Sequence, residues 1–428
     1  MLINPVKRLR GEITVPADKS ISHRSVMFGS IAEGKTQVKN CLLSADCLST
    51  ISCFRQLGIS IDVDDKTASV TMAGNGLHGL KAPSGILNTG NSGTTTRLIS
   101  GILSGQDFES TLSGDASLNT RPMKRIIKPL SLMGADISSI NKNYCAPLSI
   151  KPSKLKGIDY VSPIASAQVK SCIFLAGLYA DGITKVTEPA LSRDHSERML
   201  SAFGANVSSE GNSVSIEPEP KLIAQEIEVP GDISSAAYFI VAALISKDAE
   251  LLIKNVGINP SRAGLLTVCE KMGADITKIN ERLVSGEPVC DLLVRSSQLK
   301  GCVIEGDIIP ALIDEIPMIA VMAAFAEGTT IIKDAADLKA KETDRIMTSC
   351  TNLKAMKADI TPTEDGMIIN GTGHLKAAKL DSYLDHRIAM AMTVAAMNAE
   401  GSSEIKNAEC VDISYPSFYQ DMASLVEK

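Results

Sequence analysis

Two kinds of helix alternate along the sequence. Runs such as 233–245 and 316–326 carry apolar or small residues at almost every position, which predicts helices that are buried on all sides. Each apolar run ends at a short turn that leads into a strand, and a second, amphipathic helix follows. The turns recur at spacings of 66 to 80 residues: Ala32–Gly34, Ser104–Gly105, Ala180–Gly182, Ser246–Asp248, Ala326–Gly328 and Ala399–Gly401. Such self-similarity indicates an internally repeated architecture.

The amphipathic helices also end alike. Five of them finish at a similar short sequence before the next strand: Leu57-Gly58, Met133-Gly-Ala135, Phe203-Gly-Ala205, Met272-Gly-Ala274 and Met356-Lys-Ala358. Glycine just after a helix favours the left-handed backbone conformation that ends it. Each repeat therefore consists of strand, helix, strand, helix and further strands.

A coarser repeat divides the chain in two. Ile13-Thr-Val-Pro-Ala-Asp and Ile227-Glu-Val-Pro-Gly-Asp lie 214 residues apart, half of the chain, and each opens a helix. Proline stiffens a connection and ends a strand, so Pro16 and Pro230 predict a two-stranded hinge. We expect an α/β (α+β) fold with domains 18–229 and 1–17 plus 230–428. Three repeats in each would wrap sheets around central helices, as a layered packing and not a doubly wound sheet.

Composition narrows the class of protein. The 428 residues are 44% hydrophobic and 21% charged, with a net charge of −6, as in an ordinary soluble globular protein. This balance disfavours nucleic-acid and membrane partners, and no apolar run is long enough for a membrane helix. The ten cysteines form no CxxC pair, and Cys172, Cys269 and Cys350 lie in apolar helical patterns. We expect reduced, buried thiols in a cytoplasmic protein.

The segment 87–97 predicts a loop that feeds the N-terminus of a helix. It contains two glycines and four threonines and precedes apolar residues at helical spacing, with Asn91 or Ser92 as the N-cap. Small residues and a helix N-terminus suit an anion. A P-loop is disfavoured, because Asn91 stands where its lysine is required. A plain capping loop remains an alternative.

Basic residues recur at the predicted helix starts, where they oppose the helix dipole. They are Lys19, Arg24, Arg121 (before Pro122 at the first helical position), Lys170, Arg193, Lys341, Arg345 and Arg387. One such residue is no more than a solvated surface charge, but the repetition predicts bound anions. Two arginine sets on two domains suggest two anionic substrates held between them.

Carboxylates interrupt this basic pattern at Asp314 and Glu342, which are candidates for acid–base chemistry in an otherwise cationic cleft. His23, His195 and His386 lie beside the motifs. They lack metal-ligand spacing and are more typical of structural hydrogen bonding.

These motifs closely resemble those of the EPSP synthase family, over residues 5 to 420. The matching segments are Asp18-Lys-Ser-x-x-x-Arg24, Gly90-Asn-Ser-Gly-Thr94, Gly114-Asp-x-Ser-x-x-x-Arg-Pro-Met123, Ser166-Ala-Gln168, Lys341-Glu-x-x-Arg345 and Asp385-His-Arg387. The resemblance implies a two-domain inverse α/β barrel of six βαβαββ units with hinged closure. It also implies transfer of the enolpyruvyl group of phosphoenolpyruvate to shikimate 3-phosphate, without metal or organic cofactor.

The resemblance assigns roles to residues of this sequence. The implied catalytic residues are Asp314 as base, with Glu342 and Lys19 for protonation and phosphate departure. The implied shikimate 3-phosphate ligands are Lys19, Ser20, Arg24, Ser166, Ala167, Gln168, Arg193, Asp314 and Lys341. The implied phosphoenolpyruvate ligands are Lys19, Asn91, Gly93, Arg121, Gln168, Arg345 and Arg387. Glyphosate is the expected inhibitor, and a monomer is the expected state.

Two positions depart from the family pattern. Many members have a lysine where this chain has Ser414, and a tyrosine where it has Ser192-Arg193-Asp194. We infer that Arg193 supplies the phosphate charge instead.

Two alternatives remain open. The UDP-N-acetylglucosamine enolpyruvyl transferases share the fold but usually carry a reactive cysteine where this chain has Ala116. A non-catalytic phosphometabolite-binding protein is disfavoured by the combination of Lys19, Asp314 and Glu342, because anion binding gains nothing from carboxylates.

Overall fold

The structure is a computed structural model that describes residues 1–427 and has a mixed α/β fold. The chain divides into two compact units. Unit 1 contains Met1–Pro16, Pro230–Leu283 and the chain from Glu287 onward, and unit 2 contains Ala17–Val229 with Val284–Gly286. Each unit has its own hydrophobic core.

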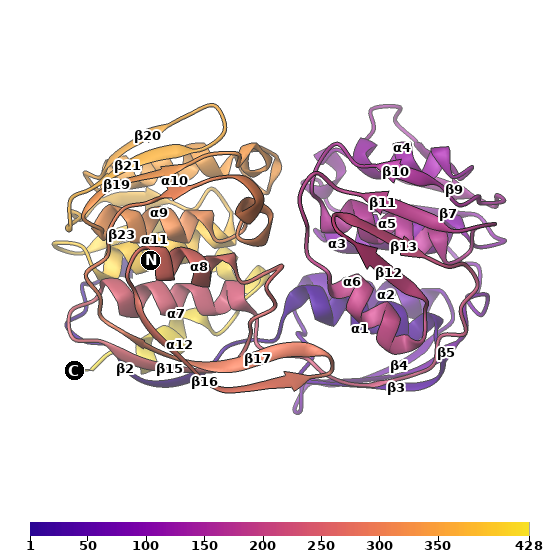
Figure 1. The fold of residues 1–428 in the computed structure, drawn as a ribbon, viewed down its shortest axis with the longest axis horizontal. Helices are drawn as coiled ribbons and strands as arrows, with labels where there is room; N and C mark the ends of the chain where they lie inside the picture. The colour runs from indigo at the N-terminus through magenta and orange to yellow at the C-terminus, as the bar shows by residue number, and fades with distance from the viewer. Residues whose placement is uncertain (428) are drawn as a thin grey trace. The chain divides into compact units, whose positions relative to one another are not determined.

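Unit 2 is built around three helices, α1 (Lys19–Ile31), α3 (Gly93–Ser104) and α5 (Ala167–Gly177), which are almost entirely buried (Figure 1). Helices α2 (Ala45–Gln56), α4 (Lys124–Leu132) and α6 (His195–Phe203) bury only one face. Leu118–Thr120 forms a short 3-10 turn, η1. Leucine, isoleucine and valine supply most of the core.

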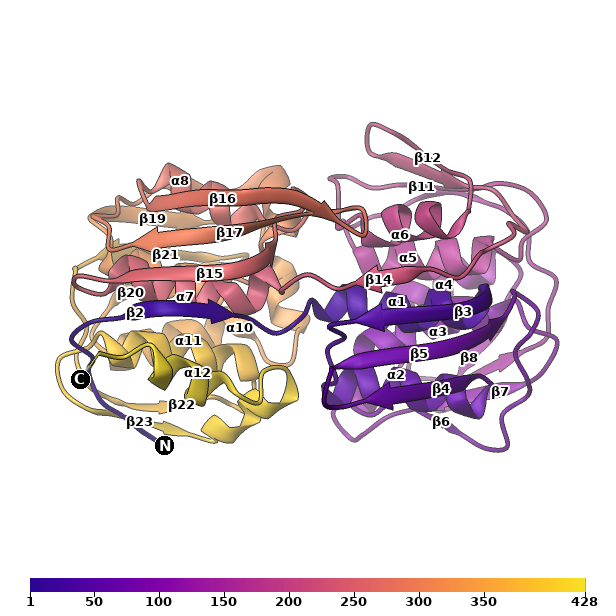
Figure 2. The ribbon, with the colours of Figure 1, turned by 90° about the horizontal axis from the view of Figure 1, so that it is seen from below.

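Three four-stranded sheets complete unit 2 (Figure 2). Their strands, in spatial order, are β14 (Glu226–Glu228), β3 (Glu33–Lys39), β5 (Ser69–Asn75) and β4 (Ser60–Asp64); β6 (Leu87–Asn88), β7 (Ser110–Ser113), β9 (Leu148–Lys151) and β8 (Asp136–Ser139); and β10 (Asp159–Val161), β11 (Thr184–Thr187), β13 (Ser213–Ile216) and β12 (Val207–Glu210). In each sheet the first pair is parallel and the other two pairs are antiparallel.

Unit 1 is built around α7 (Ile233–Ile245), α9 (Ile316–Phe325) and α11 (His386–Met397), which contact one another (Figure 1). The helices α7 and α9 coincide with the apolar runs in the sequence, and their burial confirms that prediction. The other helices are α8 (Gly264–Lys271), α10 (Arg345–Ala355) and α12 (Phe418–Ser424), with 3-10 turns η2 (Gly306–Ala311), η3 (Ala336–Ala340) and η4 (Ala408–Ile413).

The sheets of unit 1 repeat the pattern of one parallel pair with antiparallel neighbours. Their strands, in spatial order, are β16 (Asp275–Val284), β17 (Glu287–Arg295), β15 (Glu250–Gly257) and β2 (Arg10–Thr14); β18 (Val303–Ile304), β19 (Gly328–Ile332), β21 (Met367–Gly371) and β20 (Asp359–Pro362); and β1 (Leu2–Ile3), β23 (Ser403–Lys406) and β22 (Lys379–Asp381). Strand β2 therefore pairs in parallel with β15, which lies far from it in the sequence (Figure 2).

The helix ends follow the sequence signals closely. The glycines predicted to end the amphipathic helices all have positive φ: 87° at Gly58, 94° at Gly134, 106° at Gly204 and 83° at Gly273. Lys357 adopts the same left-handed conformation without being glycine, with a φ of 69°. This group of predictions is confirmed.

The prediction for Pro122 is wrong. Helix α4 begins at Lys124 with Met123 as N-cap, so Pro122 lies outside the helix. The preceding residues 118–120 form the separate turn η1, which Asp115 starts by accepting a hydrogen bond from the Leu118 amide at 2.7 Å. Pro122 therefore lies in the connection between η1 and α4, where it favours an extended conformation of the residue before it.

The cysteines are free, and Cys172, Cys269 and Cys350 are buried as the sequence predicts. In residues 1–427 there is no helix with the length and apolar character to span a bilayer. The same residues contain no group of three or more histidine, cysteine, aspartate or glutamate side chains that could hold a metal ion.

Candidate active site

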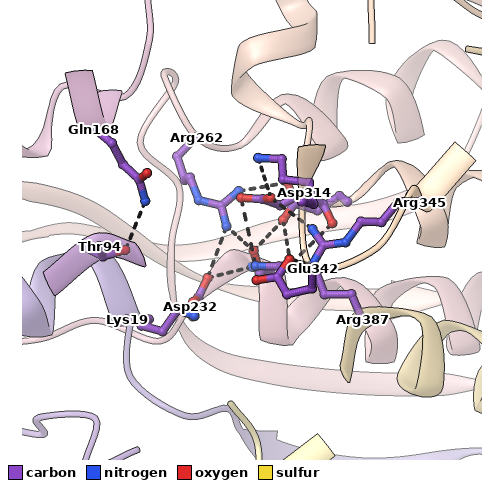
Figure 3. A network of polar contacts seen from close by, with 12 residues as sticks. Lys19, Thr94, Gln168, Asp232, Arg262, Asp314, Glu342, Arg345 and Arg387 are labelled. Atoms are coloured by element: carbon purple, nitrogen blue, oxygen red, sulfur yellow. Dashed lines mark hydrogen bonds and ion pairs between the residues drawn. The ribbon is translucent and has the colours of Figure 1, made fainter. Parts of the chain in front are cut away.

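The candidate residues of unit 1 gather where α9, α10 and α11 begin (Figure 3). Asp314 lies two residues before α9, and Lys341 and Glu342 lie in the turn between η3 and α10. Arg345 is the first residue of α10 and Arg387 is the second residue of α11. The starts of these three helices therefore bring together side chains that are far apart in the sequence.

Arg345 is the centre of this cluster, although it is only 1% exposed. Its Nε donates to Asp385 Oδ2 at 2.8 Å, its Nη1 donates to Asp314 Oδ1 at 3.3 Å, and its Nη2 donates to Glu342. Burial opposes the guanidinium charge, but Asp385 and Glu342 outweigh burial and raise the pKa of Arg345. The arginine thus fixes both carboxylates that the sequence nominates for acid–base chemistry.

Asp385 is the N-cap of α11 and is fully buried. It accepts a hydrogen bond from the Arg387 amide at 3.0 Å as well as the bonds from Arg345. Burial raises the pKa of this carboxyl, but Arg345 more than compensates and lowers it below its usual value. Asp385 is therefore an ionised counter-charge for Arg345.

Asp314 is surrounded by three basic side chains. Its Oδ1 lies 3.4 Å from Lys341 Nζ and 3.3 Å from Arg345 Nη1, and its Oδ2 lies 4.0 Å from Arg387 Nη2. Arg387 Nη1 also donates to the Asp314 carbonyl at 3.3 Å. The structure thus brings together all the candidate residues of unit 1.

The cluster contains further carboxylates besides Asp314 and Glu342. The sequence-based expectation of an otherwise cationic cleft is therefore wrong. Glu315 is buried beside Asp314, and its Oε2 accepts a hydrogen bond from Arg262 Nη1 at 2.8 Å. Its Oε1 lies 3.6 Å from Arg387 Nη1 and accepts a hydrogen bond from the Ser234 hydroxyl. Glu315 and Asp385 balance much of the arginine charge, because buried charges must be paired.

In unit 2 the glycine–threonine loop begins α3, and its N-cap is Ser92. The Ser92 hydroxyl accepts a hydrogen bond from the Thr95 amide at 3.1 Å. Asn91, the other N-cap candidate, donates to Asp115 Oδ2 at 2.7 Å and accepts hydrogen bonds from Arg121 through its backbone and side-chain oxygens. Asn91 therefore fixes Arg121 beside Gly93.

Gln168, at the start of α5, is fixed from both ends of its amide group (Figure 3). Its Oε1 accepts a hydrogen bond from Arg97 Nη1 at 2.7 Å, and its Nε2 donates to Thr94 Oγ1 at 3.1 Å. Arg97 is 8% exposed. Nothing in the sequence pattern indicated that Arg97 orients Gln168.

The remaining candidates of unit 2 lie near the starts of α1, α5 and α6. Lys19 Nζ lies 3.2 Å from Asp46 Oδ2. Arg24 is buried, and its Nε and Nη2 donate to Ser196 Oγ at 2.7 Å and Ser171 Oγ at 2.8 Å. Its Nη1 donates to the Ser20 carbonyl at 3.1 Å. Thus Arg24 joins Ser20 to α5 and α6.

Ser166 is the N-cap of α5 and Ala167 is its first residue, while Arg193 lies two residues before α6. Lys170, which the sequence places among the basic helix starts, is 2% exposed and lies between Glu188 and Glu197. Its charge is therefore held inside unit 2. For Lys170 the expectation of a bound anion is wrong.

The chain is similar to proteins of one family. The family model for "EPSP synthase (3-phosphoshikimate 1-carboxyvinyltransferase)" matches residues 3–422. A 3-phosphoshikimate 1-carboxyvinyltransferase from Thermoanaerobacter sp. is 56% identical over 412 residues, 96% of each chain. A relative of the same name from Brevibacillus brevis is 54% identical over 97% of each chain. The structure of EPSP synthase from Acinetobacter baumannii superposes with a TM-score of 0.89 and is 47% identical, covering 99% of this chain and 98% of that chain. With the motif residues gathered at the helix starts and the match running nearly end to end, the chain belongs to the EPSP synthase family.

Proposed function

We propose that this protein transfers the enolpyruvyl group of phosphoenolpyruvate to the 5-hydroxyl of shikimate 3-phosphate and releases phosphate. The observation that carries the proposal is the Asp314 carboxylate, held within 4.0 Å of Lys341, Arg345 and Arg387 in a family member. Neighbouring cations keep a carboxylate ionised, and only the ionised form can accept a proton. The reaction serves the shikimate pathway.

The shikimate 3-phosphate ligands are Lys19, Ser20, Arg24, Ser166, Ala167, Gln168, Arg193, Asp314 and Lys341. The phosphoenolpyruvate ligands are Lys19, Asn91, Gly93, Arg121, Gln168, Arg345 and Arg387. The contacts of Arg121 with Asn91 and of Gln168 with Arg97 support the phosphoenolpyruvate set, because they fix polar side chains near Gly93. Fixed donors need little reorganisation when a charged ligand binds.

In the proposed reaction Asp314 accepts the proton of the 5-hydroxyl, whose oxygen attacks C2 of phosphoenolpyruvate. Glu342 and Lys19 together serve protonation and phosphate departure: one proton passes from this pair to the methylene carbon, C3, to give a tetrahedral intermediate. The same pair then takes back a C3 proton as the C–O bond to phosphate breaks, which forms the double bond of the enol ether product. Arg345 orients both acid–base carboxylates, since it donates to Asp314 and to Glu342.

The fold proposed with this function is an inverse α/β barrel of six βαβαββ units, three in each of two domains. The recurring sheet order of one parallel and then antiparallel pairs supports it. The proposed domains are 18–229 and 1–17 plus 230–428, with a hinge near Pro16 and Pro230. We also propose that the enzyme acts as a monomer and that glyphosate inhibits it at the phosphoenolpyruvate site.

The alternative activity on UDP-N-acetylglucosamine is not favoured. Ala116 occupies the position at which that branch usually carries its cysteine, and the relatives compared above are 3-phosphoshikimate 1-carboxyvinyltransferases.

A coupled assay for phosphate release tests the proposal directly. Release should require both phosphoenolpyruvate and shikimate 3-phosphate and should be absent with either alone. Release from phosphoenolpyruvate without the second substrate, or no release with both, would contradict it. UDP-N-acetylglucosamine in place of shikimate 3-phosphate serves as the control and should give no phosphate.

A further inference from the structure

Unit 2 contains a buried charged group that the substrate ligands do not include. Lys170 on α5 lies between the carboxylates of Glu188, which follows β11, and Glu197 on α6. The Nζ–O distances are 2.9 Å to Glu188 and 2.7 Å to Glu197, and each of the three side chains is more than nine-tenths buried. Three ionisable groups withdrawn from water must satisfy one another.

Glu188 makes more contacts than the ion pair requires. Its Oε1 accepts a hydrogen bond from the Ser166 amide at 2.8 Å. Its Oε2 accepts hydrogen bonds from the Ser192 hydroxyl at 2.8 Å and the Ser192 amide at 3.3 Å, besides the contact with Lys170. One carboxylate therefore joins the start of α5 to the loop before α6.

Both segments carry proposed ligands of shikimate 3-phosphate. Ser166 is followed directly by Ala167 and Gln168, and Ser192 is followed by Arg193. The distance between the start of α5 and Arg193 therefore depends on a side chain that is itself too deeply buried to meet the substrate.

Glu197 provides the contrast. Its carboxylate contacts Lys170 and, within residues 1–427, neither Ser166 nor Ser192. Burial lowers the pKa of Lys170, but Glu197 and Glu188 together outweigh burial and raise it. Both glutamates thus stabilise the lysine charge, and Lys170 itself donates to the Ser192 carbonyl at 3.4 Å. Of the two glutamates, only Glu188 bonds to Ser166 and Ser192.

We propose that Glu188 is a positioning residue for shikimate 3-phosphate, which sets the start of α5 against the Ser192–Arg193 segment. The inference rests on the proposed assignment of Ser166 and Arg193 to that substrate. Every partner of Glu188 is a donor: two amides, a hydroxyl and an ammonium group. In a Glu188→Gln variant the NH₂ group would face either the Ser166 amide or the Ser192 amide and the Lys170 ammonium group, so one of the two backbone amides would lose its acceptor.

The test compares Glu188→Gln with Glu197→Gln, because both changes remove one negative charge next to Lys170. Each variant is assayed in two series. In one, shikimate 3-phosphate is varied at saturating phosphoenolpyruvate; in the other, phosphoenolpyruvate is varied at saturating shikimate 3-phosphate. Binding of shikimate 3-phosphate alone is measured by calorimetry, and melting temperatures are recorded. Both variants should melt earlier. Only Glu188→Gln should raise the KM and Kd for shikimate 3-phosphate, about tenfold or more, with kcat within about threefold of the native value.

Glu188→Asp keeps the charge but shortens the side chain by one methylene group. We expect it to fold at least as well as Glu188→Gln and to raise the KM for shikimate 3-phosphate by a smaller factor. It also replaces Glu188→Gln if that variant fails to fold, and an unchanged KM in Glu188→Asp would then overturn the proposal.

An Arg193→Ala variant separates failure of the inference from failure of the site assignment. If Arg193→Ala weakens shikimate 3-phosphate binding while Glu188→Gln leaves it unchanged, or if Glu197→Gln weakens it equally, the positioning role of Glu188 is overturned. If Arg193→Ala has no effect, the assignment of the segment is wrong and the inference is overturned with it.

Discussion

At Gly93 one added methyl group should weaken binding of the inhibitor glyphosate more than binding of the substrate phosphoenolpyruvate. Gly93 is the first residue of α3, and its φ lies outside the left-handed region, so alanine fits the backbone. A Cβ added there would lie 2.8 Å from Arg97 Nη1, 3.6 Å from Arg97 Cζ and 3.8 Å from Arg121 Nη1. The methyl group would therefore press on the side chain that orients Gln168.

The size of the effect follows from this contact. Arg97 can move, but moving it strains its 2.7 Å bond to Gln168 in a nearly buried position. Overpacking of this kind costs roughly 1–3 kcal/mol. If all of that energy is lost from glyphosate binding, it corresponds to a factor of roughly 5 to 160 in the inhibition constant, and we expect a rise of roughly tenfold to a hundredfold. Phosphoenolpyruvate is shorter than glyphosate, so its KM should rise by a smaller factor.

Inhibition kinetics on native protein and Gly93→Ala measure this ratio. Gly85→Ala is a matched control in the same stretch of chain, because a Cβ at Gly85 has no atom within 4 Å. We expect native inhibition in the control. Equal inhibition constants for native protein and Gly93→Ala would show that this loop does not line the phosphoenolpyruvate site. If Arg97 transmits the effect, adding Arg97→Lys to Gly93→Ala should give a non-additive change.

Three further outcomes are expected. Asp314→Ala should keep most shikimate 3-phosphate binding, measured by calorimetry, but lose at least ~10²–10⁴-fold in kcat, and near-normal turnover would remove Asp314 from the mechanism. Shikimate 3-phosphate should make the protein more compact and strengthen phosphoenolpyruvate binding, and small-angle scattering with no change in radius would count against hinged closure. Burial lowers the pKa of His23 to about 3 from 6.5, so its contribution to stability is complete above pH 6.5 and is lost as the pH falls toward 3. Between pH 6.5 and 5 urea unfolding should reveal a loss of about 2 kcal/mol from this residue, and an identical pH dependence in His23→Asn would disprove the assignment.

The sequence carried most of the information about where helices begin and end. Asp18, Ser92, Asp344 and Asp385 each precede a helix and accept hydrogen bonds from its first amides. Such caps are local signals, readable from a few consecutive residues. The candidate site of unit 1 was predictable for the same reason, because its members lie at or just before helix starts.

The partners of those residues were not predictable. Arg262 and Glu315 form a buried pair across 53 residues of sequence, and neither lies in a pattern that indicates the other. The same holds for Lys170, whose position at a helix start suggested that it binds an anion. Its partners are instead Glu188, directly after β11, and Glu197 on α6. Ion pairing inside a core depends on tertiary packing, and local sequence contains little trace of it.

The pairing of β2 has a consequence for synthesis on the ribosome. Arg10 lies opposite Glu250 in the sheet, and its amide donates to the Leu425 carbonyl at 2.9 Å. Strand β2 is thus synthesised long before its sheet partner β15, and longer still before Leu425. Residues 17–229, by contrast, hold almost all of unit 2 and can fold while translation continues. Nascent chains should therefore acquire protease resistance first in unit 2 and later in the sheet that contains β2.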